Sequence, residues 1–119
     1  MKQYSIRGAI TVNSNTVEDI RSNTIELLER IIEKNNIDVE DCVNIIFTAT
    51  KDITKAYPAR FAREIGFDEC PLMCFQEMNV DNSLNLCIRV MVTINYEGNY
   101  SPKHVYLKGA KVLRPDIAE

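Results

Sequence analysis

Three arginines lie inside segments whose composition predicts regular secondary structure. Arg7 and Arg89 each interrupt a run of apolar and β-branched residues, and Arg63 belongs to a short helical pattern. A guanidinium group is costly to bury without an anion, so an arginine in the middle of a strand indicates a carboxylate or phosphate partner. That partner is either an acid of the chain, such as Glu77, or the anionic group of a substrate.

The segment Cys74-Phe75-Gln76-Glu77-Met78 places an acid in an otherwise apolar strand pattern. Because Cys74 and Glu77 are three residues apart, they point to opposite faces of a regular strand. They line one cavity only through a bulge, or else they serve two different sites. Cys74 is more simply a small buried hydrophobe than a nucleophile, because no histidine or other base stands near it in the sequence.

Other candidate groups give weaker signals. We expect the single histidine, His104, to be non-catalytic unless a cleft holds it. The four cysteines are expected to be separate thiols, because their spacing matches neither paired CxxC motifs nor a zinc pattern. The sequence contains no glycine-rich phosphate loop, Ser/His/Asp set or metal-ligand cluster, so it gives no signal for hydrolytic or metal chemistry.

The composition of the sequence indicates one domain and argues against nucleic-acid-binding and membrane proteins. A chain of 119 residues with 45% hydrophobic side chains fits one domain, spanning 1–119, that folds without disulfide or metal staples. Fourteen basic against seventeen acidic residues give a net charge of -3, the wrong sign for a general nucleic-acid binder. Because the sequence shows no signal peptide and no apolar stretch of about eighteen residues, we expect a cytoplasmic protein without membrane contact.

Hydrophobic periodicity predicts the elements that position these residues. A long amphipathic helix is expected over 17–34, after a capping-box signal at Thr16 and Asp19. A short helix is expected between Pro58, suited to a first helical position, and Gly66, suited to a C-terminal cap. Strands are expected over 4–12, 43–50, 72–78, 86–94 and 104–107, with a turn at 81–83.

This order predicts an α+β fold, with one helix layer on a mixed sheet of about five strands. A sheet covered on one face leaves a second face to bury. Apolar side chains that could serve either face are those of Met73, Phe75, Cys87, Met91 and Val92. We therefore expect a homo-oligomer in which a second copy covers it.

Six motifs are more specific together than any one of them alone. They are Ile6-Arg7-Gly8-Ala9, Tyr57-Pro58-Ala59-Arg60 with Arg63, Cys74-Phe75-Gln76-Glu77-Met78, Cys87-Ile88-Arg89-Val90-Met91, His104-Val105-Tyr106-Leu107 and Val112-Leu113-Arg114-Pro115. In this order and at nearly unchanged spacing, they resemble the monofunctional chorismate mutase of the Bacillus type over nearly the whole chain. The resemblance implies a ferredoxin-like α+β chain that assembles as a trimeric pseudo-barrel, with active sites between subunits.

The resemblance also implies a reaction and its residues. The reaction is the cofactor-free, metal-free rearrangement of chorismate to prephenate in aromatic amino-acid biosynthesis. Arg7 and Tyr106 would hold a substrate carboxylate, Arg89 would contact a carboxylate and the breaking ether oxygen, and Glu77 would accept from the ring hydroxyl, near Cys74. Walls and mouth would be formed, partly by the adjacent chain, by Tyr57, Ala59, Arg60, Arg63, Met73 and Leu113.

Three positions depart from the family pattern, and two other functions compete. Tyr57 stands where phenylalanine is usual, Arg60 where lysine is usual, and Met73 replaces a smaller polar residue. One alternative is a trimeric imine or enamine deaminase of similar fold, which gives no reason for Glu77. The other is a non-catalytic metabolite-binding trimer, in which the same cations hold an anion without turnover.

Overall fold

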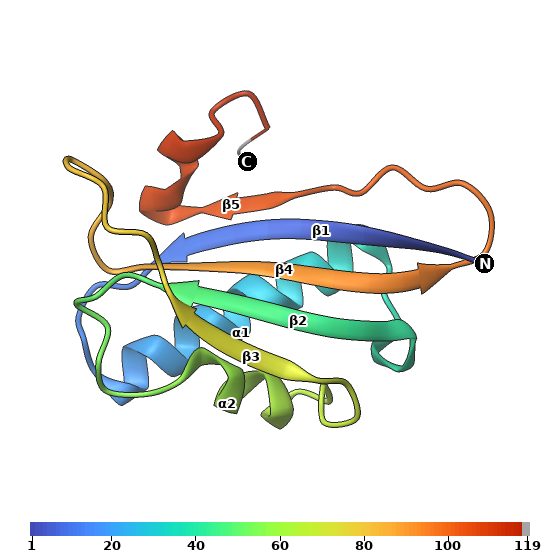
Figure 1. Cartoon of the computed structure of the whole chain (residues 1–119), viewed down its shortest axis with the longest axis horizontal. Helices are drawn as coiled ribbons and strands as arrows, with labels where there is room; N and C mark the ends of the chain where they lie inside the picture. The colour runs from blue at the N-terminus through green and yellow to red at the C-terminus, as the bar shows by residue number, and fades with distance from the viewer. Residues whose placement is uncertain (118–119) are drawn as a thin grey trace.

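A computed structural model describes residues 1–117 and shows a five-stranded sheet with its two α-helices packed on one face (Figure 1). Its elements, in chain order, are β1 (Lys2–Thr11), α1 (Val17–Asn35), the 3₁₀ helix η1 (Val39–Asp41), β2 (Cys42–Ala49), α2 (Pro58–Glu64), β3 (Leu72–Gln76), β4 (Cys87–Tyr96), β5 (Val105–Leu107) and the 3₁₀ helix η2 (Lys108–Leu113). The predicted α+β class is confirmed. None of the described helices is long and apolar enough to span a membrane.

The sheet is mixed, as predicted, and its strands follow the order β3-β2-β4-β1-β5. The central strand β4 is antiparallel to both β1 and β2. The outer strands β3 and β5 run parallel to their neighbours β2 and β1. Residues distant in sequence therefore lie side by side near the centre, where Arg89 on β4 stands between Ala9 on β1 and Thr48 on β2.

The main core lies between α1 and one face of the sheet. Alternate residues of β1 and β4, such as Ile6, Ile10 and Ile88, are fully buried there against Leu27 and Leu28 of α1. This is the pattern expected when a period-2 strand packs on one stripe of an amphipathic helix. Burial of this stripe fixes which face of every strand remains outside the core.

Both helices begin and end where the sequence predicts. The Thr16 side chain accepts a hydrogen bond from the Asp19 N–H at 3.1 Å, while the Asp19 carboxylate accepts from Ser14 rather than closing a full capping box. Pro58 opens α2, and Gly66 follows its end with φ +110 and donates its N–H to Arg63 O. Glycine suits this left-handed position because it has no Cβ.

The observed strands differ from the predicted ones by one or two residues at most of their ends; β3, for example, stops at Gln76, before Glu77. The strand expected from residue 86 begins at Cys87, because Leu86 has a left-handed φ of 50°. The Leu86 N–H donates to both carboxylate oxygens of Asp52, at 3.1 and 3.0 Å. His104 lies just outside β5 rather than within it, although its Nδ1 accepts the Arg7 N–H at 2.9 Å.

The second face of the sheet, called here the open face, carries neither α-helix, and the 3₁₀ helix η2 packs over the part of it near β1 and β5. Its apolar side chains are unusually exposed, with Met73, Phe75 and Met91 at 57%, 50% and 37% exposure. These residues come from β3 and β4 and share the face with Arg7 and Arg89 by strand alternation. An apolar patch of this kind, rimmed by polar groups, is typical of an interaction surface.

Gly8 is the position where α1 approaches β1 most closely. A Cβ built there would lie 2.9 Å from both Val105 O and Ile31 Cδ1. We predict that Gly8→Ala lowers the free energy of unfolding by about 1–3 kcal/mol, because the Val105 carbonyl belongs to the β1–β5 pairing and cannot move aside. Urea unfolding followed by circular dichroism measures the change. Gln3→Ala, on the exposed end of the same strand, should stay within about 0.5 kcal/mol, and equal effects of the two substitutions would contradict the close-packing explanation.

Candidate active site

A cavity of about 220 Å³ opens on the open face and brings together three predicted site residues, Arg7, Glu77 and Arg89. The rest of its lining consists of Gly8, Ile46, Thr48, Val90 and Met91. These residues come from β1, β2, β4 and the segment that follows β3. Only the sheet's strand order places them around one space.

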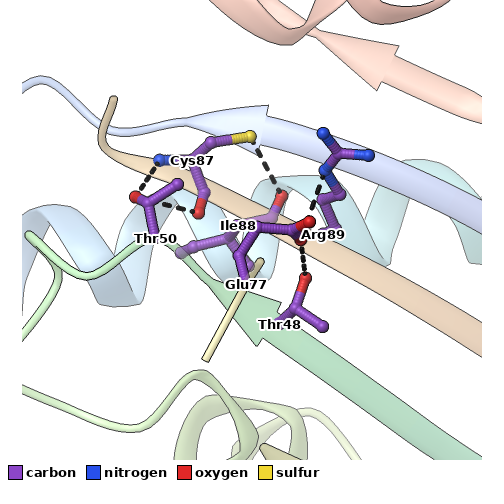
Figure 2. Close-up of polar contacts among 6 residues, drawn as sticks. All are labelled: Thr48, Thr50, Glu77, Cys87, Ile88 and Arg89. Carbon is purple, nitrogen blue, oxygen red and sulfur yellow. Dashed lines mark hydrogen bonds and ion pairs between the residues drawn. The ribbon is translucent and has the colours of Figure 1, made fainter. Parts of the chain in front are cut away.

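The Glu77 carboxylate lines this cavity and makes two polar contacts (Figure 2). Its Oε1 accepts a hydrogen bond from the Thr48 hydroxyl at 2.5 Å and lies 3.4 Å from Arg89 Nε. The Arg89 contact is an ion pair without hydrogen-bond geometry, since Nε is buried and makes no hydrogen bond. Glu77 is thus the acid of this chain that pairs with Arg89. The terminal nitrogens of Arg89 point away from Glu77 (Figure 2).

Arg7 has no such internal partner. Within residues 1–117, no carboxylate forms an ion pair with its guanidinium group, which lies exposed at the cavity. Its backbone N–H is held by His104 Nδ1, and burial together with the positive charges of Arg7 and Arg114 lowers the pKa of His104. A neutral imidazole is needed to accept this bond. His104 therefore fixes the backbone of Arg7, while the guanidinium stays available to an external anion.

The net charge of the cavity is opposite in sign to the net charge of the whole chain. Two arginines and one glutamate leave it with one excess positive charge, whereas the chain carries a net charge of -3. Low dielectric in a partly buried site strengthens attraction to anions relative to the open surface. The arrangement suits a small anionic ligand with at least one carboxylate and one hydrogen-bond donor.

Tyr106 and Leu113 lie beside the cavity, on the far side of β1. The register places Arg89, Ala9 and Tyr106 in one row across β4, β1 and β5, so the small Ala9 separates the arginine from the tyrosine. Tyr106 is only 3% exposed and packs with Ala9, Cys87 and Ala110, and Leu113 of η2 contacts this cluster. Neither residue lines the open-face cavity itself; both lie next to it, beyond β1.

The remaining predicted residues form a second group around α2 and β3. Cys74 packs against the main core, on the helix side of the sheet, and borders another cavity of about 240 Å³ together with Tyr57. Burial raises the pKa of the Cys74 thiol, although a backbone bond to Ala59 and the charge of Arg63 oppose the rise. The protonated thiol is a poor nucleophile.

Three more residues complete the placement of the predicted set. Tyr57 is 76% exposed, and Arg60 lies over the ring of its neighbour Phe61 with 5.4 Å from Cζ to the ring centroid. Met73 belongs to the open face, since it pairs with Ile46. None of these three side chains lines the cavity that contains Arg89.

Strand alternation separates the two groups, as the spacing of Cys74 and Glu77 predicts. Cys74 pairs with buried Phe47, whereas Glu77 bonds to Thr48 on the opposite face. The Glu77 N–H donates to Ala49 O at 2.8 Å, which continues the pairing of β3 without a bulge. One chain therefore presents two partial sites on different sides of its sheet.

Two residues at the cavity were not anticipated from the sequence. Thr48 lines it directly, and its position after buried Phe47 is the alternation signal that could have identified it. Cys87 lies beside the ion pair, where burial raises its pKa to about 11, the charge of Arg89 opposes this rise and that of Glu77 adds to it. Cys87 is therefore a neutral group at neutral pH.

Other features of the described chain do not form a competing site. A groove of about 550 Å³ follows α1, but its charged groups pair with acids of the chain, as Arg21 does with Glu64 at 3.0 Å. Within residues 1–117, no three His, Cys, Asp or Glu side chains gather as metal ligands. All four cysteines are free thiols.

Comparison with known proteins agrees with this geometry. Chorismate mutase AroH of Bacillus subtilis is 44% identical over 95% of this chain and 91% of its own length. Chorismate mutase AroH of Thermus thermophilus is 44% identical over 94% and 93%. A solved structure of a chorismate mutase from Clostridium thermocellum superposes with a TM-score of 0.88 and 46% identity, covering 92% of this chain and 98% of that one.

The family model for chorismate mutase type I matches residues 3–117, which include every residue of both partial sites. The match spans nearly the whole chain, and it agrees with the relatives in sequence and in fold. The chain belongs to the chorismate mutase type I family.

Proposed function

We propose that this protein is a cytoplasmic chorismate mutase that rearranges chorismate to prephenate in aromatic amino-acid biosynthesis. The observation that carries the proposal is the meeting of Arg7, Glu77 and Arg89 at one cavity in a member of this family. Neither the deaminase nor the binding-protein alternative explains an acid that is paired with Arg89 and held by a threonine hydroxyl.

The reaction explains why the site contains cations and hydrogen-bond groups. In a [3,3] rearrangement one carbon–carbon bond forms as the ether carbon–oxygen bond breaks, and all the atoms stay in one molecule. Negative charge grows on the ether oxygen and positive charge on the ring, so no nucleophile or base is required. The protein must hold the dianion in a compact conformer and present a fixed cation to that oxygen.

We propose a role for each charged residue of the open-face cavity. The terminal nitrogens of Arg89 point away from Glu77 and are available to the ether oxygen and a carboxylate (Figure 2). Arg7, which lacks an internal anion, binds a carboxylate together with Tyr106. Glu77 accepts a hydrogen bond from the ring hydroxyl.

The second group of residues completes the site from a neighbouring chain. Because α2 and β3 present Cys74 and Arg63 away from the Arg89 cavity, a second copy laid over the open face can supply them. The exposed Met73, Phe75 and Met91 give that copy an apolar surface to bury. We propose a homotrimer with a site at each interface. The neighbour's half is formed by Tyr57, Ala59, Arg60, Arg63, Met73 and Cys74, and Leu113 lies at the mouth beside Tyr106.

Typical free-energy contributions indicate that no single residue accounts for the whole lowering of the activation barrier. Enzymes lower their barriers by at least about 8 kcal/mol, and one preorganised donor in a dry site supplies about 3–4 kcal/mol. Arg89 therefore needs help from conformer selection by Arg7, Tyr106 and the partner's cations.

The direct test is incubation of the pure protein with chorismate while its ultraviolet absorbance is followed. We expect loss of chorismate with prephenate as the product, identified by mass spectrometry. Release of ammonia from imine substrates would favour the deaminase instead. Binding of chorismate without turnover would favour the metabolite-binding trimer.

For Arg89, we predict that Arg89→Lys lowers kcat by about a hundredfold or more, by analogy with loss of one oxyanion donor. Lysine keeps the charge but loses the fork in which Nε faces Glu77 and the terminal nitrogens point away from it, toward the space that we assign to the substrate. Steady-state kinetics of the folded variant measures the change. Arg21→Lys, on the exposed α1 surface, is the matched control and should keep parental kcat. Near-parental kcat for Arg89→Lys would remove Arg89 from this role.

For Cys74, we predict that Cys74→Ala stays active within about tenfold, because the rearrangement forms no covalent intermediate and the thiol is protonated. Loss of an essential nucleophile would cost several more orders of magnitude. Kinetics and intact-protein mass spectrometry during turnover provide the test. An inactive but folded Cys74→Ala variant, or a substrate adduct on Cys74, would contradict the assignment.

For the shared site, we predict complementation between Arg89→Ala and Arg63→Ala. Each variant alone should be poorly active, but co-refolding a 1:1 mixture should rebuild about a quarter of the sites, since neighbouring chains are drawn independently in a closed trimer. Mass spectrometry verifies that mixed trimers form. Mixing Arg89→Ala with Arg7→Ala is the matched control: both changes lie in the same half-site, so no intact site can form. Equal activities of the two mixtures would contradict an interfacial site.

A further inference from the structure

Thr48 makes a contact to the Glu77 carboxylate that the proposed mechanism has not used. Its hydroxyl donates to Glu77 Oε1 at 2.5 Å, and within residues 1–117 it is the one hydrogen-bond donor to that side chain. Thr48 lies on β2 directly opposite Arg89 on β4, and it lines the same cavity. It therefore touches the acid while standing beside the cation.

The contacts divide the two oxygens of Glu77 between different tasks. Oε1 is occupied by the Thr48 hydroxyl and also faces Arg89 Nε at 3.4 Å (Figure 2). Two groups on Oε1 leave Oε2 as the oxygen available to an external donor. The Glu77 backbone is fixed as well, because its N–H donates to Ala49 O at 2.8 Å.

The Thr48 hydroxyl and Arg89 Nε compete for the same oxygen, Glu77 Oε1, and this competition determines how close Arg89 comes to the carboxylate. A carboxylate and a guanidinium attract each other and prefer distances of about 2.7–2.9 Å when nothing else restrains them. Here the separation is 3.4 Å and the Thr48 bond is the shorter of the two. Without the hydroxyl, Glu77 is free to close onto Arg89 and draw it away from the substrate.

We infer that Thr48 is a positioning residue, which holds Glu77 so that Oε2 faces the substrate hydroxyl and Arg89 stays available for the ether oxygen. This inference rests on the proposed function and adds to it a residue that acts through Glu77. Threonine is well suited to the task, because its branched Cβ restricts χ1 in a strand and fixes the direction of the hydroxyl. Serine offers the same hydroxyl with a looser rotamer.

The test compares Thr48→Val, which keeps the shape and removes the hydroxyl, with Thr48→Ser, which keeps the hydroxyl. We expect Thr48→Val to lower kcat/KM about tenfold to a hundredfold, mainly through kcat, because a bond to a charged group is lost and two reacting contacts move. Thr48→Ser should remain within about threefold. Thr93→Val is the matched control and should remain parental, because Thr93 bonds to Ser5 on the same face outside the cavity.

A double-mutant cycle separates positioning from a general structural effect. If Thr48 acts through Glu77, then adding Thr48→Val to a Glu77→Ala background, which leaves no side-chain oxygen for Thr48 to hold, should change kcat/KM by less than about twofold. Thermal melting of every variant verifies folding, and Thr48→Ala replaces Thr48→Val if the valine variant does not fold.

Three results would overturn the inference. These are parental activity of Thr48→Val, equal losses in Thr48→Val and Thr48→Ser, and additive losses in the cycle. In each of them the wild-type protein still converts chorismate, so the proposed function survives. A wild-type protein that fails to consume chorismate would overturn the proposed function and this inference together.

Discussion

The position of a charged side chain at the middle of the sheet constrains the rest of this molecule. Arg89 lies on the central strand β4, between Ile88 and Val90, which are buried in the core. Strand alternation sends the arginine to the open face, where it requires an anion and partial shielding from water. Glu77 supplies the anion, and the neighbouring strands supply the shielding.

The same alternation explains why one chain carries two partial sites. Along β3, each successive residue changes face, so Cys74 packs with the helices while Met73 and Phe75 remain on the open face. A residue set that serves one reaction cannot converge within a single sheet of this kind. The proposed assembly with a second copy would resolve both difficulties at once, because it would bury the exposed apolar groups and bring the two halves together.

The charged groups of the site are only partly neutralised by other groups of the chain. Glu77 Oε1 serves a threonine and an arginine, which leaves Arg89 compensated but not fully engaged. Arg7 is held only through its backbone, by a histidine whose lowered pKa keeps it neutral. Both cations are thus positioned by the fold while their charge stays available for an anionic substrate, which is the preorganisation that catalysis by charge stabilisation needs.

Much of this architecture follows from local sequence signals. The amphipathic period of α1, the Thr16 cap, and Pro58 and Gly66 around α2 determine these helices through short-range hydrogen bonds and sterics. Strand composition predicted the five strands, and the motif resemblance predicted the family. Errors were confined to strand ends such as Leu86, where a distant carboxylate, Asp52, holds a left-handed backbone.

The pairing of elements was decided by tertiary structure. The sequence by itself determined that Cys74 and Glu77 face opposite ways, because a period of two residues is a property of any strand. It did not determine that Thr48 would lie opposite Arg89 and bond to Glu77, since that contact joins three segments through the sheet's register. Strand order and register are set by the packing of the whole core, which no local pattern encodes.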